Sequence, residues 1–230
     1  MLDDIFLFLN SVSQNKNWKN DFENFYKILT NYNLKINLTR IDDYTDFYIK
    51  HVYNSALCLK EINISNLNIF DIGTGAGFPG LVWKILIPSI NLTLIESVNK
   101  KCIFLEKVIK ELNLKNAKVI NDRSEILSFK FNEKSDIVTA RAVSNLTMLL
   151  EITSRFSKIN SHLLFFKGAK YETELLESSK IIKELNLKLD NVIKDELIED
   201  SNYVVLDFIK LKSTPKKYPR SFNKIKNITI

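Results

Sequence analysis

The segment from Asn68 to Gly80, NIFDIGTGAGFPG, holds four of the five glycines in this 230-residue chain. Glycine tolerates a positive φ and lets the backbone lie close to another group. A chain that places nearly all of its glycines in one turn needs unusual backbone there, and a bound ligand is one reason for it. The run LNIFDI is short and apolar, so it predicts a buried strand that ends in the glycine turn.

Strands and helices alternate through most of the remaining chain. Apolar runs predict further strands at 91–97, 117–121, 136–141, 161–168 and 201–211, and helices at 80–86, 99–114, 145–156 and 171–185. This alternation favours an α/β fold with a doubly wound, Rossmann-like sheet. The expected organisation is a helical cap over residues 1–64, a core over 65–212 and a basic tail over 213–230.

The chain carries a formal net charge of +6, which favours nucleic acid or another anionic partner. Six basic residues and no acid lie between Lys212 and Lys226, with Tyr218 and Phe222 among them. Charge interleaved with aromatic rings predicts an exposed tail that contacts RNA, although a run of charge is also typical of solvated surface. The residues expected to bind RNA there are Lys216, Lys217 and Arg220.

The two cysteines, Cys58 and Cys102, form no metal-binding or CxxC pattern. The N-terminal sequence MLDDIFLFLN has acids where a signal peptide needs bases, and no apolar run reaches membrane-spanning length. The sequence therefore predicts a soluble, cytoplasmic protein with reduced thiols and no metal site.

The glycine turn fits two ligand-binding patterns. Gly75, Gly77 and Gly80 match G-x-G-x-x-G, the fingerprint of dinucleotide binding. Asp71 to Gly77 also match D-x-G-x-G-x-G, which resembles the first motif of class I methyltransferases that use S-adenosylmethionine (SAM). SAM carries an ammonium and a sulfonium, whereas a pyrophosphate would be repelled by Asp71. The carboxylate therefore favours SAM.

Glu96 follows about twenty residues after the glycines, at the predicted end of the next strand. An acid there accepts hydrogen bonds from two ribose hydroxyls, which SAM and NAD both carry. Glu96 therefore supports a nucleoside without choosing between the two. A glycine turn that only packs a helix on the sheet is the remaining alternative.

The possible methyl acceptors demand different residues. Methylation of a pyrimidine carbon needs a cysteine nucleophile after the fourth strand, where the chain instead reads TARAVSNL. Methylation of an exocyclic amine usually uses an Asn/Asp-Pro-Pro-aromatic loop, and no two prolines here are adjacent. A ring nitrogen such as guanine N7 is already nucleophilic and needs only positioning. These absences fit that acceptor, and no residue is predicted to form a covalent intermediate.

Five segments together resemble one family: FDIGTGAGFPG, LIESVNKKCIFLEKV, NDRSEI, TARAVSNL and FFKG. The chain is similar to the ribosomal small-subunit methyltransferase G family, also called GidB. The resemblance implies SAM-dependent methylation of guanine N7 at one site in bacterial 16S rRNA. It also implies a seven-stranded class I methyltransferase sheet with an N-terminal helical cap.

The resemblance also assigns roles to residues around the turn. Gly73 and Phe78 match positions that contact SAM, and Ser124 and Glu125 match the adenine-side contact. Arg141 matches an arginine at the ligand pocket, where its planar fork of donors could hold the SAM carboxylate or an RNA phosphate.

Two further residues are candidates for RNA contact. His51 lies in KHVYNS, which matches the family pattern H-x-x-D-S except that Asn54 replaces the acid. His51 is expected to face the RNA or to be a structural histidine. Lys167 stands at a predicted strand end near the pocket.

The sequence therefore predicts an enzyme, a 16S rRNA (guanine-N7) methyltransferase. In this interpretation Asp71, the glycines and Glu96 hold SAM, while the cap, Arg141, Lys167 and the tail hold the RNA. An NAD-dependent oxidoreductase that uses the same turn is one alternative. A non-catalytic RNA-binding protein on a methyltransferase fold is the other.

Overall fold

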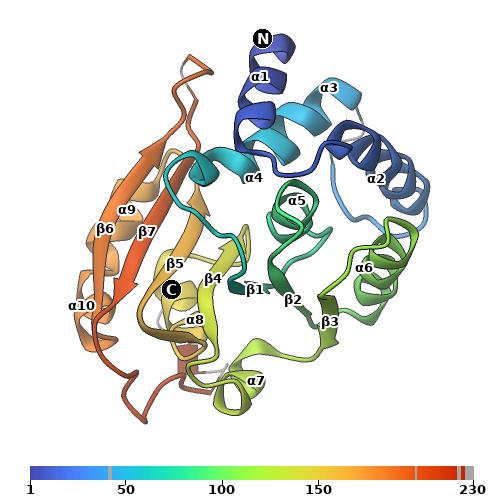
Figure 1. The fold of residues 1–230 in the computed structure, drawn as a ribbon. Coiled ribbons are helices and arrows are strands. Elements are labelled where there is room, and N and C mark those ends of the chain that lie inside the picture. The colour runs from blue at the N-terminus through green and yellow to red at the C-terminus, as the bar shows by residue number, and fades with distance from the viewer. Residues whose placement is uncertain (41–42, 200, 222–223, 226–230) are drawn as a thin grey trace.

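A seven-stranded sheet with the order β3-β2-β1-β4-β5-β7-β6 runs through the computed structural model of the chain (Figure 1). The structure describes residues 1–40, 43–199, 201–221 and 224–225. The first five strands of this order are parallel, and β7 lies antiparallel between β5 and β6. The strands are β1 (Asn68–Ile72), β2 (Asn91–Glu96), β3 (Ala117–Asn121), β4 (Ser135–Arg141), β5 (Ser157–Lys167), β6 (Leu187–Lys194) and β7 (Val204–Lys210).

Helices cover both faces of the sheet, which confirms the predicted α/β class. Ile69 and Phe70 are neighbours on β1 but belong to different core clusters, because successive side chains of a strand point to opposite faces. One face packs against α5 (Gly80–Leu86) and α6 (Asn99–Glu111). The other packs against α7 (Ser124–Lys130), α8 (Leu146–Thr153), α9 (Tyr171–Glu177) and α10 (Ser179–Glu184). None of the helices in the described ranges combines the length and apolar character needed to cross a membrane.

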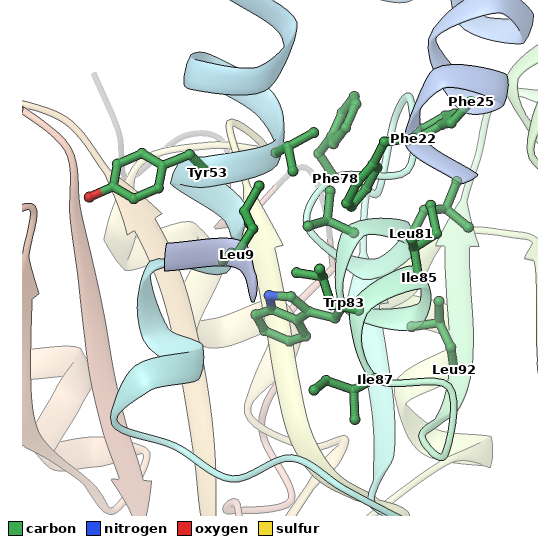
Figure 2. Packing of buried hydrophobic residues seen from close by; sticks show 14 of the residues in the cluster. Leu9, Phe22, Phe25, Tyr53, Phe78, Leu81, Trp83, Ile85, Ile87 and Leu92 are labelled. Atoms are coloured by element: carbon green, nitrogen blue, oxygen red, sulfur yellow. The ribbon is translucent and has the colours of Figure 1, made fainter. Parts of the chain in front are cut away.

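The N-terminal cap shares its core with the sheet. Figure 2 shows Leu9, Phe22 and Phe25 of the cap close to Trp83 and Leu81 of α5. The Trp83 indole N–H donates a hydrogen bond to the Ser55 carbonyl at 2.6 Å, so the largest buried side chain is also satisfied. The cap consists of α1 (Leu2–Val12), α2 (Trp18–Asn33), α3 (Tyr44–Asp46), the π-helix η1 (Phe47–Tyr53), α4 (Asn54–Ala56) and the 3-10 helix η2 (Leu57–Lys60).

Two elements differ from the pattern in the sequence. The strand β6 was not predicted from its residues, because it is a sheet edge whose side chains are mostly exposed or half-buried. Its sequence LKLDNVIK therefore lacks a continuous apolar run. The helix predicted at 171–185 is two helices, with Ser178 between α9 and α10.

The C-terminal segment is not the exposed tail that its charge predicted. Tyr218 and Ile225 are buried in the core cluster of α8 and α10. Arg220 makes a bidentate ion pair with Glu151 of α8, with Nε–Oε1 at 3.0 Å and Nη2–Oε2 at 2.5 Å. Glu151 is fully buried and also accepts a hydrogen bond from the Arg220 backbone N–H. The basic and aromatic side chains that suggested RNA contact are thus partly used to pack the segment against the protein.

The other tail residues have different surroundings. Lys217 forms an ion pair with Glu184 at 2.8 Å, although its side chain stays exposed. Lys216 is exposed and forms no ion pair with a described residue. Phe222 and Lys226 lie outside the described residues.

We expect Arg220→Gln to lower the free energy of unfolding by about 2–3 kcal/mol, because Glu151 would remain as a buried charge without its cation. Urea denaturation monitored by tryptophan fluorescence measures this change. Lys216→Gln is the matched control in the same segment and should change stability by no more than about 0.5 kcal/mol. Equal stability of the two variants would contradict a structural role for Arg220.

Candidate functional site

The glycine turn after β1 has three residues with positive φ: Gly73 at 64°, Gly75 at 60° and Gly77 at 95°. A Cβ on Gly73 would lie 2.8 Å from a Val143 methyl, so protein packing alone forbids a side chain there. A Cβ on Gly75 would meet nothing closer than the Gly73 carbonyl oxygen at 4.0 Å. The turn therefore presents bare backbone to open space at Gly75, as a close-lying ligand requires.

The Asp71 carboxylate holds this turn in place through hydrogen bonds. Its Oδ2 accepts a hydrogen bond from the Thr74 hydroxyl at 2.7 Å and another from the Gly80 backbone N–H at 2.9 Å. Its Oδ1 is buried and has no hydrogen-bond partner among the described residues. Burial raises the pKa of Asp71 to about 6. The carboxylate thus holds both ends of the turn with one oxygen and leaves the other without a hydrogen-bond partner among the described residues.

Glu96, at the end of β2, also forms a hydrogen bond with this turn. Its Oε2 accepts from the Gly75 N–H at 3.1 Å and its Oε1 accepts from the Val98 N–H at 2.8 Å. Each carboxylate oxygen has a further lone pair. Glu96 is therefore oriented by the backbone and can still accept hydrogen bonds from ribose hydroxyls.

A cavity of about 350 Å³ lies beside the turn. Its walls come from the carboxyl ends of β1, β2, β3 and β4 and from one side of α8. This is the point where the strand order reverses, between β1 and β4, and such sheets bind ligands there. The lining residues are Ile72, Gly73, Ile95, Ser97, Asp122, Arg123, Ser124, Glu125, Val143, Met148 and Ile152.

These residues fit the SAM predicted from the sequence. Ile95, Met148 and Ile152 offer an apolar wall to a flat adenine ring, and Ser124 and Glu125 offer polar atoms at its edge. Asp71 supplies an unpartnered buried oxygen that suits the ammonium. Sequence reasoning did not include Met148 and Ile152, although their spacing of four places them on one face of a helix.

Arg141 at the end of β4 turns toward the cap instead of lining this cavity. Its Nη1 donates to the Lys50 carbonyl at 3.1 Å, and its Nη2 lies 2.7 Å from His51 Nδ1. The guanidinium carbon is 5.1 Å from the centre of the Phe78 ring. Arg141 forms no ion pair with a described carboxylate. Burial lowers its pKa to about 10, so the cation persists at neutral pH.

His51 is neutral and its tautomer follows from its neighbours. Burial, followed by the charges of Arg141 and Lys50, lowers the pKa of His51 to about 3. A guanidinium can only donate, so Nδ1 accepts from Arg141 and the proton sits on Nε2. That nitrogen lies 2.9 Å from Thr39 Oγ1, to which it donates. The result is a relay of hydrogen bonds from Arg141 through His51 to Thr39 in the cap.

Several residues singled out in the sequence are therefore buried in packing. Phe78 stacks on His51 at 4.2 Å with an angle of 7° between the rings, and neither lines the cavity. Lys167 is buried, with Nζ 2.6 Å from Glu174 Oε2 and 3.0 Å from the Ser144 carbonyl. Asn54, where the family pattern has an acid, is buried with its Oδ1 unpartnered among the described residues.

Comparison with known proteins shows the family of this chain. The model of the GidB family, described as rRNA small subunit methyltransferase G, matches residues 18–198. The chain belongs to this family. A relative named ribosomal RNA small subunit methyltransferase G from Mesoplasma florum is 44% identical over 210 residues, which cover 90% of this chain and 87% of the relative. A relative of the same name from Mycoplasma capricolum is 38% identical and covers 96% and 95%. The predicted family resemblance is confirmed.

Solved structures show the same fold at low identity. A SAM-dependent methyltransferase from Aquifex aeolicus aligns with a TM-score of 0.56 and 17% identity, over 75% of this chain and 97% of that one. TYW2 from M. jannaschii in complex with AdoMet aligns with a TM-score of 0.55 and 16% identity, over 75% of this chain and 80% of that one. Both support the class I methyltransferase fold of the GidB-family chain.

We expect Asp71→Asn to weaken SAM binding at least tenfold without loss of folding. The amide oxygen can still accept from Thr74 and Gly80, but the charge that we expect to attract the SAM ammonium is gone, which costs roughly 1.5–3 kcal/mol. Isothermal titration calorimetry with SAM measures the affinity. Affinity equal to that of the wild type would contradict a role for the carboxylate.

The same variant tests the raised pKa. In the folded wild type Asp71 holds its proton up to about pH 6, whereas the unfolded chain releases it near 3.8. The folded state therefore binds the extra proton between these values, and this group's contribution to stability falls as pH rises from about 4 to 6. The difference in unfolding free energy, wild type minus variant, should fall over that window and stay constant from pH 7 to 8.

Arg141→Lys should reduce the rate of methyl transfer at least tenfold while the melting temperature changes by only a few degrees. A lysine keeps the charge but has no planar fork with which to donate to both Lys50 and His51. Arg155→Lys is the control, because Arg155 donates to the Tyr218 carbonyl away from the cavity. A loss of rate in step with the loss of stability in both variants would make Arg141 a structural residue only.

Proposed function

We propose that the protein methylates N7 of one guanosine in 16S rRNA, with SAM as the methyl donor. The observation that carries this proposal is a cavity at the β1–β4 switch point in a chain of the rRNA small subunit methyltransferase G family. Beside that cavity, Asp71 keeps a buried, unpartnered oxygen and Glu96 is oriented by the turn. The names of the relatives support an rRNA substrate.

The chain's residues would divide the cofactor between them. The Asp71 carboxylate would hold the ammonium, Glu96 the ribose hydroxyls, and Ser124 and Glu125 the edge of the adenine. The bare backbone at Gly75 leaves room for the ligand to lie against the turn. When bound, SAM supplies a methyl group on a positively charged sulfur.

The acceptor nitrogen needs orientation more than activation. Guanine N7 has a lone pair in the ring plane, so no residue has to remove a proton before the attack. His51 stays neutral and is already hydrogen-bonded on both ring nitrogens, so it is a positioning residue for Arg141. Arg141 is at the carboxyl edge of β4 next to the cofactor turn, where its charge can orient an RNA phosphate or the SAM carboxylate.

The proposal extends to the partner and the location. The substrate is 16S rRNA, alone or in a ribosomal particle, and the enzyme works in the cytoplasm. Exposed Lys216 and Lys217 remain candidates for RNA contact. Arg220 is committed to Glu151, and Lys167 to Glu174, so their charges serve the protein's own structure.

The two alternative functions make different demands. An NAD-dependent oxidoreductase would place a pyrophosphate at the turn, next to the buried Asp71 carboxylate, which repels it. Calorimetry with SAM and with NAD separates these two ligands. A non-catalytic RNA-binding protein on this fold would bind RNA and transfer no methyl group.

The deciding experiment incubates the purified protein with methyl-labelled SAM and small ribosomal subunits from a bacterium that lacks the family enzyme. We expect label in 16S rRNA and, after nuclease digestion, a single N7-methylguanosine by mass spectrometry. Asp71→Asn should transfer far less label at limiting SAM. Label in another nucleoside, or none with a SAM-binding protein, would refute the proposed function.

A further inference from the structure

A second cavity, of about 550 Å³, lies at the amino ends of β1, β2 and β3, the opposite edge of the sheet from the cofactor site. The sheet surface there is bounded by the turn that follows α7. We call this cavity the basic recess. Its lining residues are Asn68, Phe70, Asn91, Leu92, Thr93, Asn116, Ala117, Lys118, Lys130, Phe131 and Lys134.

The charge of the basic recess sets it apart. Three lysines line it, Lys118, Lys130 and Lys134, and no carboxylate does. Four other cavities among the described residues each have at least one acid in their walls. All three lysines are exposed, and none forms an ion pair with a described residue. The two carboxylates nearest to Lys134 in sequence are already paired with other lysines: Glu133 lies 3.3 Å from Lys210 Nζ, and Asp136 lies 2.5 Å from Lys158 Nζ.

The recess also offers groups that recognise bases. Phe131 is half-buried, and its ring packs edge-on against Phe70 at 5.7 Å. Lys130 Nζ lies 5.6 Å from the centre of the Phe131 ring. Asn91 and Asn116 are exposed and carry amides that can donate and accept. Cations for phosphates beside an aromatic ring for a base are the features of single-stranded nucleic acid sites.

The helix α7 connects the recess to the cofactor cavity. It begins at Ser124 and Glu125, which line the cofactor cavity, and ends at Lys130, which lines the recess. In Figure 1 it lies between β3 and β4, as a crossover between parallel strands must. Its exposed side carries Ile126 and Phe129, which are 62% and 55% exposed. Seven residues of helix span roughly 10 Å, so the two cavities are within reach of one RNA strand.

We propose that the basic recess binds a single-stranded segment of the substrate RNA, away from the nucleotide that is methylated. Lys118, Lys130 and Lys134 contact phosphates, and Phe131 stacks on a base. The proposal rests on the proposed function for the identity of the RNA. The enzyme would then bind its substrate both at the methylation site and at the basic recess. A short oligonucleotide that carries only the target guanosine would therefore bind weakly.

The test compares Lys118→Gln/Lys130→Gln/Lys134→Gln with the control Lys16→Gln/Lys110→Gln/Lys183→Gln, which removes the same charge from exposed lysines outside the recess. The probe is a 16S rRNA transcript, and binding is measured without SAM over a range of salt. We expect the recess variant to bind at least tenfold more weakly at low salt. Its slope of log affinity against log salt should be shallower by about 2, since each phosphate contact contributes roughly 0.7.

SAM affinity and melting temperature should be unchanged in the recess variant. Phe131→Leu, which keeps an apolar side chain, should weaken binding of a single-stranded RNA and leave binding of a duplex of equal length unchanged. Equal losses in the recess and control variants, or no loss in either, would overturn the proposal. If the wild type binds the transcript through the recess but transfers no methyl group, the proposed function fails while the RNA site stands.

Discussion

The buried carboxylate of Asp71 is the contact on which the cofactor site depends. It joins the end of β1 to Thr74 and to the first residue of α5, and so closes the loop that carries three positive-φ glycines. An ionised carboxylate in the interior is costly, and its raised pKa reflects that cost. A buried carboxylate with a raised pKa is expected of a group that serves a ligand.

The cofactor site and the N-terminal cap are also joined by direct contacts. Arg141 follows the end of β4 beside the cofactor turn, and its guanidinium donates hydrogen bonds to Lys50 and His51 of the cap. Phe78 leaves the turn itself and stacks under the same histidine. The cap is therefore held against the cofactor site by polar and stacking contacts, in addition to the apolar core around Trp83. If RNA binding displaced the cap, we expect these contacts to shift the turn as well, even where the RNA does not touch the cofactor.

The fold and the centre of the site were predictable because their signals are local. Asp71, the glycines and Glu96 sit at the ends of strands whose apolar runs are visible in the sequence, and parallel strands bring those ends together. Other features depend on partners far along the chain. Glu151 and Arg220 are 69 residues apart, and no pattern in either segment predicts the ion pair between them. The charge of the C-terminal segment therefore predicted an RNA-binding surface. The contacts of Lys167 with Glu174 and of His51 with Thr39 could not be predicted from the sequence either. The edge strand β6 lacked an apolar run because little of it is buried.

The ion pair between Arg220 and Glu151 has a consequence for how the protein is made. Glu151 lies on α8, between Met148 and Ile152, which form a wall of the cofactor cavity. Glu151 is synthesised 69 residues before Arg220, so it has no counter-charge until most of the chain has left the ribosome. Because synthesis proceeds from the N-terminus, we expect the α8 wall of the cofactor cavity to reach its final packing only near the end of translation, and the affinity for the methyl donor to develop with it.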